Sequence, residues 1–209
     1  MFQINSPFFR FISTIGNIIL ASILWIIGCI PIITIGTSSA ALYYTCVKVI
    51  RRDRGYLLTD FFHAYKANLK QGCIVTMVSL FISFLLYTNN RYISSLASAP
   101  YYLIVIYRIT FTLFVVTLIY IIPNMSRFTM KLFELLKLSI FMVIRHFYQT
   151  FIMFVLCVAF FILILSIPVL LFFLPATYML LQSLIMENVL KKYMRDITTS
   201  SDSDVWYLE

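Results

Sequence analysis

The sequence predicts an all-α polytopic integral membrane protein, with about six transmembrane helices and two amphipathic helices at the cytoplasmic interface. Of its 209 residues, 62% are hydrophobic and only 11% are charged, whereas soluble domains carry about a quarter charged residues. Apolar stretches of roughly 17 to 25 residues recur along the chain, which is the length that a helix needs to cross a bilayer. Most basic residues lie between these stretches, as expected for loops on the cytoplasmic side.

The first predicted hairpin occupies the uncharged interval between Arg10 and Lys48. Its first span, 11–30, ends at Pro31, because proline cannot donate a backbone hydrogen bond and clashes with the preceding turn. The hydroxyl residues after the proline are suited to cap a second, short span at 37–52. The stretch around Pro31 is therefore predicted to be a tight outside turn followed by a second crossing.

The middle of the chain predicts an interfacial helix, two spans and a second interfacial helix. After Gly55, the apolar residues of YLLTDFFHAYKANLKQG recur at helical spacing while two lysines lie on another face, which is typical of a helix in the membrane interface. A span at 72–87, a polar loop and a span at 101–122 follow. Pro123 ends this last span, and residues 124–149 again mix basic and apolar side chains.

The last predicted hairpin turns at Pro168. It joins a span at 150–165 to a span at 169–186 that is kinked or interrupted near Pro175. Both outside hairpins thus turn on an Ile-Pro pair. This pattern suits a duplicated half, as in many transporters, although chance similarity among apolar helices explains it equally well.

The distribution of basic residues predicts that both termini are cytoplasmic. Six spans leave only Arg91 in an outside loop and Arg108 within a span, so 14 of the 16 basic residues face the cytoplasm. With five spans, at least one basic cluster falls outside. We therefore expect a single transmembrane domain over residues 1–195 and a polar C-terminal tail over residues 196–209.

The sequence lacks the motifs of the common enzyme classes. It contains no phosphate loop, no HExxH zinc motif and no GxSxG nucleophile elbow. Its eight acidic residues lie outside the predicted spans, so a proton relay or an intramembrane aspartyl protease lacks its carboxylate. We expect a protein that is not an enzyme, with no cofactor and no metal site. The basic excess reflects topology rather than nucleic-acid binding.

Arg108 is the candidate intramembrane polar residue. A charge inside a span costs a few kcal/mol, so the side chain must face the interior of the bundle or extend to the interface. Contact with an anion or substrate is one interpretation, and snorkelling with hydrogen bonds to nearby hydroxyl or carbonyl groups is the other. His63 and His146 lie beside basic residues and are interpreted as contacts to lipid headgroups.

One long segment resembles a known family. The stretch LWIIGCIPIITIGTSSAALYYTCVKVIRRDRGYLLTDFFHAYKANLKQG is similar to the opening signature of the YesL-like membrane proteins, with the Pro31–Gly36 turn and the Asp60–Gly72 segment as its most specific parts. YIIPNMSRF and FFLPATYMLLQSLIMENVLKKY also resemble that family's pattern. Tyr65 departs from the phenylalanine that the family often carries.

The resemblance implies a multi-pass protein of the bacterial cell (plasma) membrane without an established biochemical activity. Members tend to be encoded near systems for carbohydrate uptake, so it implies a non-enzymatic accessory or regulatory role linked to a sugar ABC transporter, with the lipid bilayer and the permease subunits as partners. A small transporter or channel in its own right is the alternative, lined by the available polar residues Arg108, Tyr43, Tyr44, Thr45, Asn17 and Gln182.

Two sets of residues are the candidates for contacts. Small side chains that permit close helix packing form a candidate helix-contact face, made up of Gly36, Ser38, Ser39, Ala40 and Ala41. A cytoplasmic segment that combines aromatic, basic and amide side chains forms a candidate partner surface, made up of Asp60, Phe61, Phe62, Lys66, Asn68, Lys70 and Gln71.

Overall fold

The computed structural model describes residues 7–95, 101–128 and 130–197, and the side chains of residues 12–93, 102–128 and 130–190. Within these ranges the regular structure is entirely helical, which confirms the all-α prediction. The α-helices are α1 (Pro7–Cys29), α2 (Ile35–Thr45), α3 (Leu57–Ser95), α4 (Tyr101–Arg127), α5 (Leu132–Arg145), α6 (Phe147–Ser166) and α7 (Leu174–Ile197). Shorter helical segments are η1 (Ile32–Thr34), η2 (Cys46–Arg51) and η3 (Pro168–Phe172).

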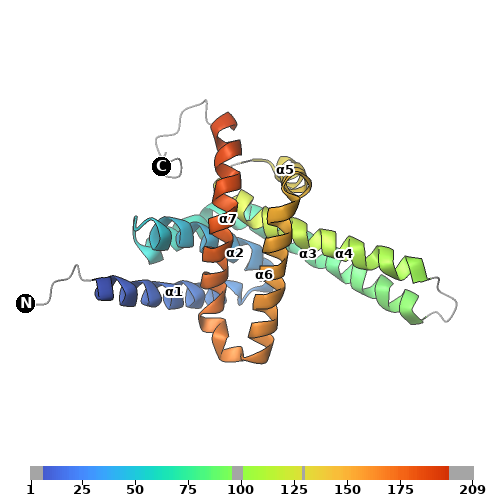
Figure 1. Ribbon diagram of the computed structural model, residues 1–209, viewed down its shortest axis with the longest axis horizontal. Helices are drawn as coiled ribbons and strands as arrows, with labels where there is room; N and C mark the ends of the chain where they lie inside the picture. Colours follow the sequence, from blue (N-terminus) through green and yellow to red (C-terminus); the bar gives the residue numbers. More distant parts are fainter. Residues whose placement is uncertain (1–6, 96–100, 129, 198–209) are drawn as a thin grey trace, which may run out of the picture.

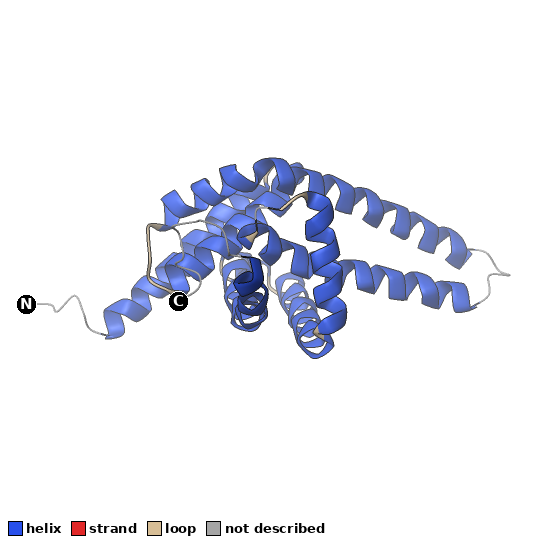
Figure 2. Cartoon of the chain, turned by 90° about the horizontal axis from the view of Figure 1, so that it is seen from above, coloured by secondary structure: helices blue, strands red, loops and turns tan. Residues whose placement is uncertain are grey.

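The helices form two hairpins around a central short helix (Figure 1). Helices α3 and α4 run side by side and project from the body, while α6 and α7 form a second hairpin that stands crosswise to α1 and to the α3–α4 hairpin. Figure 2, from above, shows the same crossing. Among the described residues, four helices are long and apolar enough to cross a membrane: Ile12–Cys29, Leu57–Ile93, Tyr102–Arg127 and Phe147–Ser166. The chain is therefore a membrane-embedded protein, and six crossings are not confirmed.

Helix α2 is the buried centre of this arrangement. It packs against α1, α3, α4 and α7, and its 11 residues are too few to cross a bilayer. The approach to α3 is so close that a Cβ atom added to Gly72 would lie 2.7 Å from the Thr37 Cα atom. The Gly36 backbone N–H donates to the Thr76 hydroxyl (2.9 Å), which donates in turn to the Gly72 carbonyl (2.8 Å). The segment 37–52, predicted as a second span, is thus helical. Its residues up to Thr45, however, belong to a helix that is buried in the core of the protein.

A sharp elbow separates the first two helices from α3. After α2 the backbone widens into the π-helical segment η2, and the turn that follows places Asp53 at φ 52° and Gly55 at φ 87°. Glycine adopts such positive φ values without the steric cost that other residues incur. The expected helix stop at Gly55 therefore has a backbone reason, and α3 begins two residues later.

Helix α3 differs most from the sequence expectation. The predicted interfacial helix, the span 72–87 and most of the following polar loop form one helix of 39 residues, about 58 Å long at 1.5 Å per residue. Gly72 does not interrupt it, because a glycine inside a helix costs only about 1 kcal/mol and here its missing side chain admits α2. Residues 96–100 of the predicted loop lie outside the described residues.

Of two prolines expected to end or interrupt a helix, Pro123 does not, whereas the interruption near Pro175 is present. Helix α4 continues through Pro123 to Arg127 rather than ending at Ile122, and its last turn packs against α5, where the Asn124 amide donates to the Ser139 hydroxyl (2.9 Å). These contacts offset the one backbone hydrogen bond that a proline removes. The interruption expected near Pro175 is confirmed: the predicted span 169–186 is divided at Phe173 into η3 and α7. Pro175 lies in the first turn of α7, where proline is favoured.

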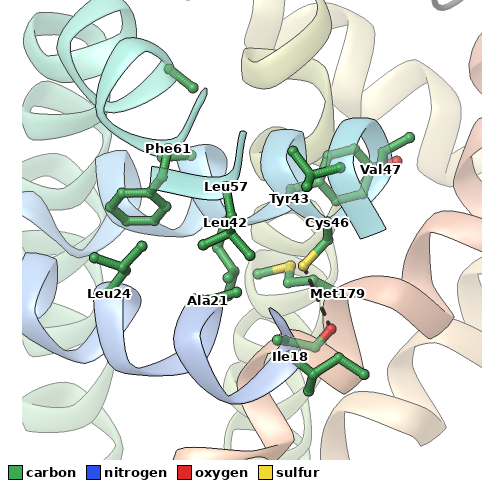
Figure 3. Close-up of a cluster of buried hydrophobic side chains, with 14 residues drawn as sticks. Ile18, Ala21, Leu24, Leu42, Tyr43, Cys46, Val47, Leu57, Phe61 and Met179 are labelled. Carbon is green, nitrogen blue, oxygen red and sulfur yellow. Dashed lines mark hydrogen bonds between the residues drawn. The ribbon is translucent and has the colours of Figure 1, made fainter. Parts of the chain in front are cut away.

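The principal core joins helices from both ends of the chain (Figure 3). Side chains of α1, α2, η2 and the start of α3 meet the first turns of α7, and the Cys46 thiol donates to the Ala176 carbonyl (3.7 Å). The Ser22 hydroxyl accepts from the Ala176 backbone N–H (3.2 Å). This core fixes the start of α7 against the N-terminal helices, which positions the charged residues described next.

Candidate functional site

A buried ion pair joins α4 to α7. Arg127 donates two hydrogen bonds to one oxygen of Glu187, from Nε at 3.0 Å and from Nη2 at 2.7 Å. Both side chains are only 2% exposed. The Tyr43 hydroxyl of α2 donates to the same oxygen, Oε1, at 3.1 Å. A charge pair removed from water in this way is strongly coupled to its partners, so α2, α4 and α7 are held in one arrangement.

Arg51 and Arg52, which lie at the elbow between α2 and α3, join the ion pair to form a charged cluster. The Arg52 guanidinium lies 4.0 Å from Glu187 Oε2, an oxygen without a hydrogen-bond donor of its own, and Arg51 donates to the Ser183 carbonyl at 3.0 Å. The sequence did not reveal this cluster. Glu187 directly follows the last predicted span and Arg127 follows Pro123, and charges at span ends are ordinary. The only available signal was a single carboxylate in the otherwise uncharged stretch LLQSLIMENVL.

Beside the ion pair lies a groove of about 380 Å³. Its walls come from the end of α2, the first part of α3, the last turn of α4 and the following segment. Side chains with polar groups in the lining are Tyr44, His63, Asn68, Gln71, Ser126 and Arg127. Gln71 donates to the Met130 carbonyl (3.2 Å), which holds the segment after α4 against α3. Arg127 of the ion pair is thus also part of the groove wall.

The predicted partner surface divides into a buried part and an exposed part. Asp60 accepts a hydrogen bond from Lys48 at 2.7 Å, and Phe61 is 1% exposed within the principal core. Their position in the first turns of α3, under the elbow, turns both side chains inward. These two residues therefore stabilise the elbow and do not lie on an accessible surface.

The remaining five residues of the partner surface lie on accessible parts of α3. Phe62, Lys66 and Lys70 follow one another at intervals of four residues and are all exposed, so they form one row along the helix. Asn68 and Gln71 line the groove beside this row. The structure thus brings together an aromatic side chain, two lysines and a polar groove on one side of α3.

The predicted helix-contact residues all lie in α2 and are all buried. Ser38 donates to the Trp25 carbonyl (3.0 Å), and Ser39 accepts from the Trp25 indole N–H (3.1 Å). Ala40 packs against α3, α4 and α5, and Ala41 belongs to the principal core. Gly36 is the point of contact with Gly72 of α3.

Arg108 lies near the start of α4, whereas Arg127 of the ion pair is the last residue of the same helix. Arg108 is exposed and lines a groove of about 350 Å³ together with Tyr87, Asn90 and Tyr107. The other polar residues considered for a channel lie elsewhere: Gln182 donates to the Ile119 carbonyl inside the protein (2.8 Å), and Tyr43 contacts Glu187. The structure does not bring them to the groove of Arg108.

Metal ligands do not gather within the part of the chain that the structure describes, where no group of three or more His, Cys, Asp or Glu side chains could hold an ion. The four cysteines, all described, are free thiols. His63 lines the groove, whereas His146 lies at the junction of α5 and α6.

These features define a membrane-embedded helical protein with a buried charge cluster and a groove beside it. Residues 18–90 match the family described as "Protein of unknown function, DUF624". YesL-like proteins belong to this family, so the match confirms the resemblance seen in the sequence over this segment. The match extends from α1 to the outer part of α3. No curated protein and no solved structure matches the chain significantly.

Proposed function

We propose that this protein is a non-enzymatic accessory or regulatory component linked to carbohydrate uptake, which associates with permease subunits of a sugar ABC transporter. The observation that carries the proposal is the exposed row of Phe62, Lys66 and Lys70 beside the groove on α3. Aromatic side chains are enriched at protein interfaces, where their rings supply buried area, and charges around them orient the partner. The YesL-like resemblance supports the choice of partner by association.

The proposed orientation places both termini in the cytoplasm of a bacterial cell, within the plasma membrane. Arg51, Arg52 and Arg127 converge on one region through Glu187 and Ser183. Arg91 and Arg108 lie toward the opposite end of α3 and α4, and this separation of charge supports the orientation.

The orientation is tested by cysteine accessibility in intact cells. A cysteine that replaces Arg54 is expected to react only after the membrane is permeabilised, and one that replaces Arg91 is expected to react from outside. Both arginines are exposed, so that accessibility reports sidedness rather than burial. Reaction of residue 54 from outside while residue 10 stays protected contradicts the proposed topology.

The partner surface is tested by charge reversal. Lys66→Glu with Lys70→Glu is expected to lower recovery of a permease subunit from native membranes about tenfold, because two interface charges each contribute up to about 1 kcal/mol and reversal adds repulsion. Crosslinking and pulldown, followed by mass spectrometry, measure the recovery. Arg91→Glu on the far end of the same helix is the matched control and is expected to leave recovery unchanged.

Two results would contradict the proposal. Wild-type protein recovered from native membranes without any transport component counts against an accessory role. Solute flux into liposomes that contain only this protein instead supports the alternative of a small transporter, especially if Arg108→Ala abolishes the flux while the protein remains folded.

A further inference from the structure

A second, apolar groove of about 230 Å³ lies between α3, α4 and α5. Its lining is aliphatic and aromatic except for the hydroxyl groups of Ser79 and Thr117. Ser79 donates to the Thr76 carbonyl (2.9 Å) and Thr117 to the Leu113 carbonyl (2.8 Å). Both donors are thus used within their own helices. The groove therefore suits a hydrocarbon chain and gives a polar ligand little to bind.

Helix α5 presents a basic and aromatic row immediately beside this groove. Leu132, Leu136 and Ile140 of α5 form part of the groove wall. The adjacent row on the same helix, one position further along, contains Phe133, Lys137 and Phe141. These three side chains are exposed, and the Lys137 ammonium lies 5.2 Å from the centre of the Phe133 ring.

The same pattern continues toward the end of α5. The Arg145 guanidinium lies 5.7 Å from the centre of the exposed Phe141 ring. Ile144 is 73% exposed beside it, whereas Leu135, Ser139, Met142 and Val143 face the core. The charged side chains on or next to this exposed face are Lys131, Glu134, Lys137 and Arg145, so the face is basic on balance. Basic residues interleaved with large apolar ones are typical of helices that bind anionic membrane surfaces.

The orientation of α5 fits a position at the membrane surface. In Figure 1, α5 is viewed nearly along its axis, while the α3–α4 and α6–α7 hairpins extend across the view. The view from above agrees that α5 runs across both hairpins (Figure 2). Whichever hairpin is aligned with the membrane normal, α5 then lies close to the plane of the bilayer. Lys137 and Arg145 lie at the level of the headgroups if the apolar groove extends into the hydrocarbon.

We propose that α5 and the apolar groove form a binding site for one anionic phospholipid, with the phosphate at Lys137 and an acyl chain in the groove. The two halves of such a ligand match the two neighbouring rows of α5, one cationic and one apolar. A soluble phosphorylated compound leaves the groove empty, and a protein partner does not require a hydrocarbon-lined groove. The site lies on a different helix from the row Phe62, Lys66 and Lys70 and is independent of it.

Native mass spectrometry of the detergent-purified protein tests the site, with phosphatidylglycerol and phosphatidylcholine as probes. Wild-type protein is expected to bind phosphatidylglycerol more tightly than phosphatidylcholine. Lys137→Gln is expected to lower the affinity for phosphatidylglycerol about fivefold, since a basic residue at an anionic surface contributes about 1 kcal/mol. Ile140→Trp, which fills the groove from a half-exposed position, is expected to lower the affinity for both lipids.

Matched variants distinguish the site from general charge effects. Lys137→Arg is expected to retain binding, and Arg91→Gln, at an exposed cation near the end of α3, is expected to have no effect. The thermal unfolding midpoint in detergent shows that each variant is folded. Equal binding of phosphatidylglycerol by wild type and Lys137→Gln overturns the proposal, and so does competition by glycerol phosphate alone, which identifies a site for free phosphate. Loss of a co-purifying protein from Lys137→Gln with unchanged lipid binding also overturns it, because α5 is then a protein interface.

Discussion

Glu187→Leu is expected to lower the free energy of unfolding by about 3–5 kcal/mol, the usual cost of removing one partner from a buried ion pair. The substitution removes both hydrogen bonds from Arg127 and the acceptor of the Tyr43 hydroxyl. The Arg127 guanidinium then remains buried, with its side chain 2% exposed, but no longer contacts the carboxylate of Glu187. The change is measured by reversible unfolding of the purified protein in mixed detergent micelles.

A second substitution separates the ion pair from simple packing. Arg127→Met combined with Glu187→Leu is expected to recover most of the loss, because an apolar pair of similar volume leaves no buried charge without a partner. The matched control is the ion pair between Lys48 and Asp60, whose side chains are 23% and 13% exposed. Asp60→Asn is expected to cost less than Glu187→Leu, because this pair is less deeply buried and asparagine keeps a side-chain oxygen that can accept from Lys48.

The ion-pair prediction has a clear contrary outcome. If the double variant is no more stable than Glu187→Leu alone, the loss of stability arises from packing around α7 and not from the buried charge of Arg127. If Glu187→Leu has the stability of the wild type, the cluster does not hold α2, α4 and α7 together.

Gly72→Ala is expected to destabilise the protein by about 1–3 kcal/mol, although alanine favours the helical conformation by about 1 kcal/mol over glycine. The added methyl group would lie 2.7 Å from both the Cα and the backbone nitrogen of Thr37. Backbone atoms cannot turn aside as a side chain can, so α2 and α3 must separate. Separation also weakens the hydrogen bond from Gly36 to Thr76. The unfolding midpoint in detergent measures the effect.

Gly16 offers the matched control for this substitution. It also lies inside a helix, α1, but a Cβ atom added there meets no atom within 4 Å. Gly16→Ala is therefore expected to leave stability unchanged or raise it slightly. A loss of similar size in both variants would indicate a general effect of helical substitutions in this protein and would refute the close α2–α3 contact.

The candidate sites were only partly predictable. The segment Asp60–Gln71 was selected from its composition, and the structure shows that its members face different directions: Phe61 enters the core, whereas Phe62 and Lys66 are exposed. A helical pattern gives the angle between side chains but not the position of the neighbouring helix. The ion pair was not predicted at all, because Arg127 and Glu187 are 60 residues apart and Tyr43 is 144 residues from Glu187.

Local features of the sequence were enough to predict the helical class, the membrane environment, the resemblance to the YesL-like proteins and the turns at Pro31, Gly55 and Pro168. These properties depend on local hydropathy and on backbone restrictions of proline and glycine, which act over a few residues. Only the tertiary structure decided that α3 continues through Gly72 and that α2 is a buried core helix. Both outcomes follow from contacts between distant segments. The missing side chain of Gly72, for example, matters only because α2 packs directly against the backbone at that position.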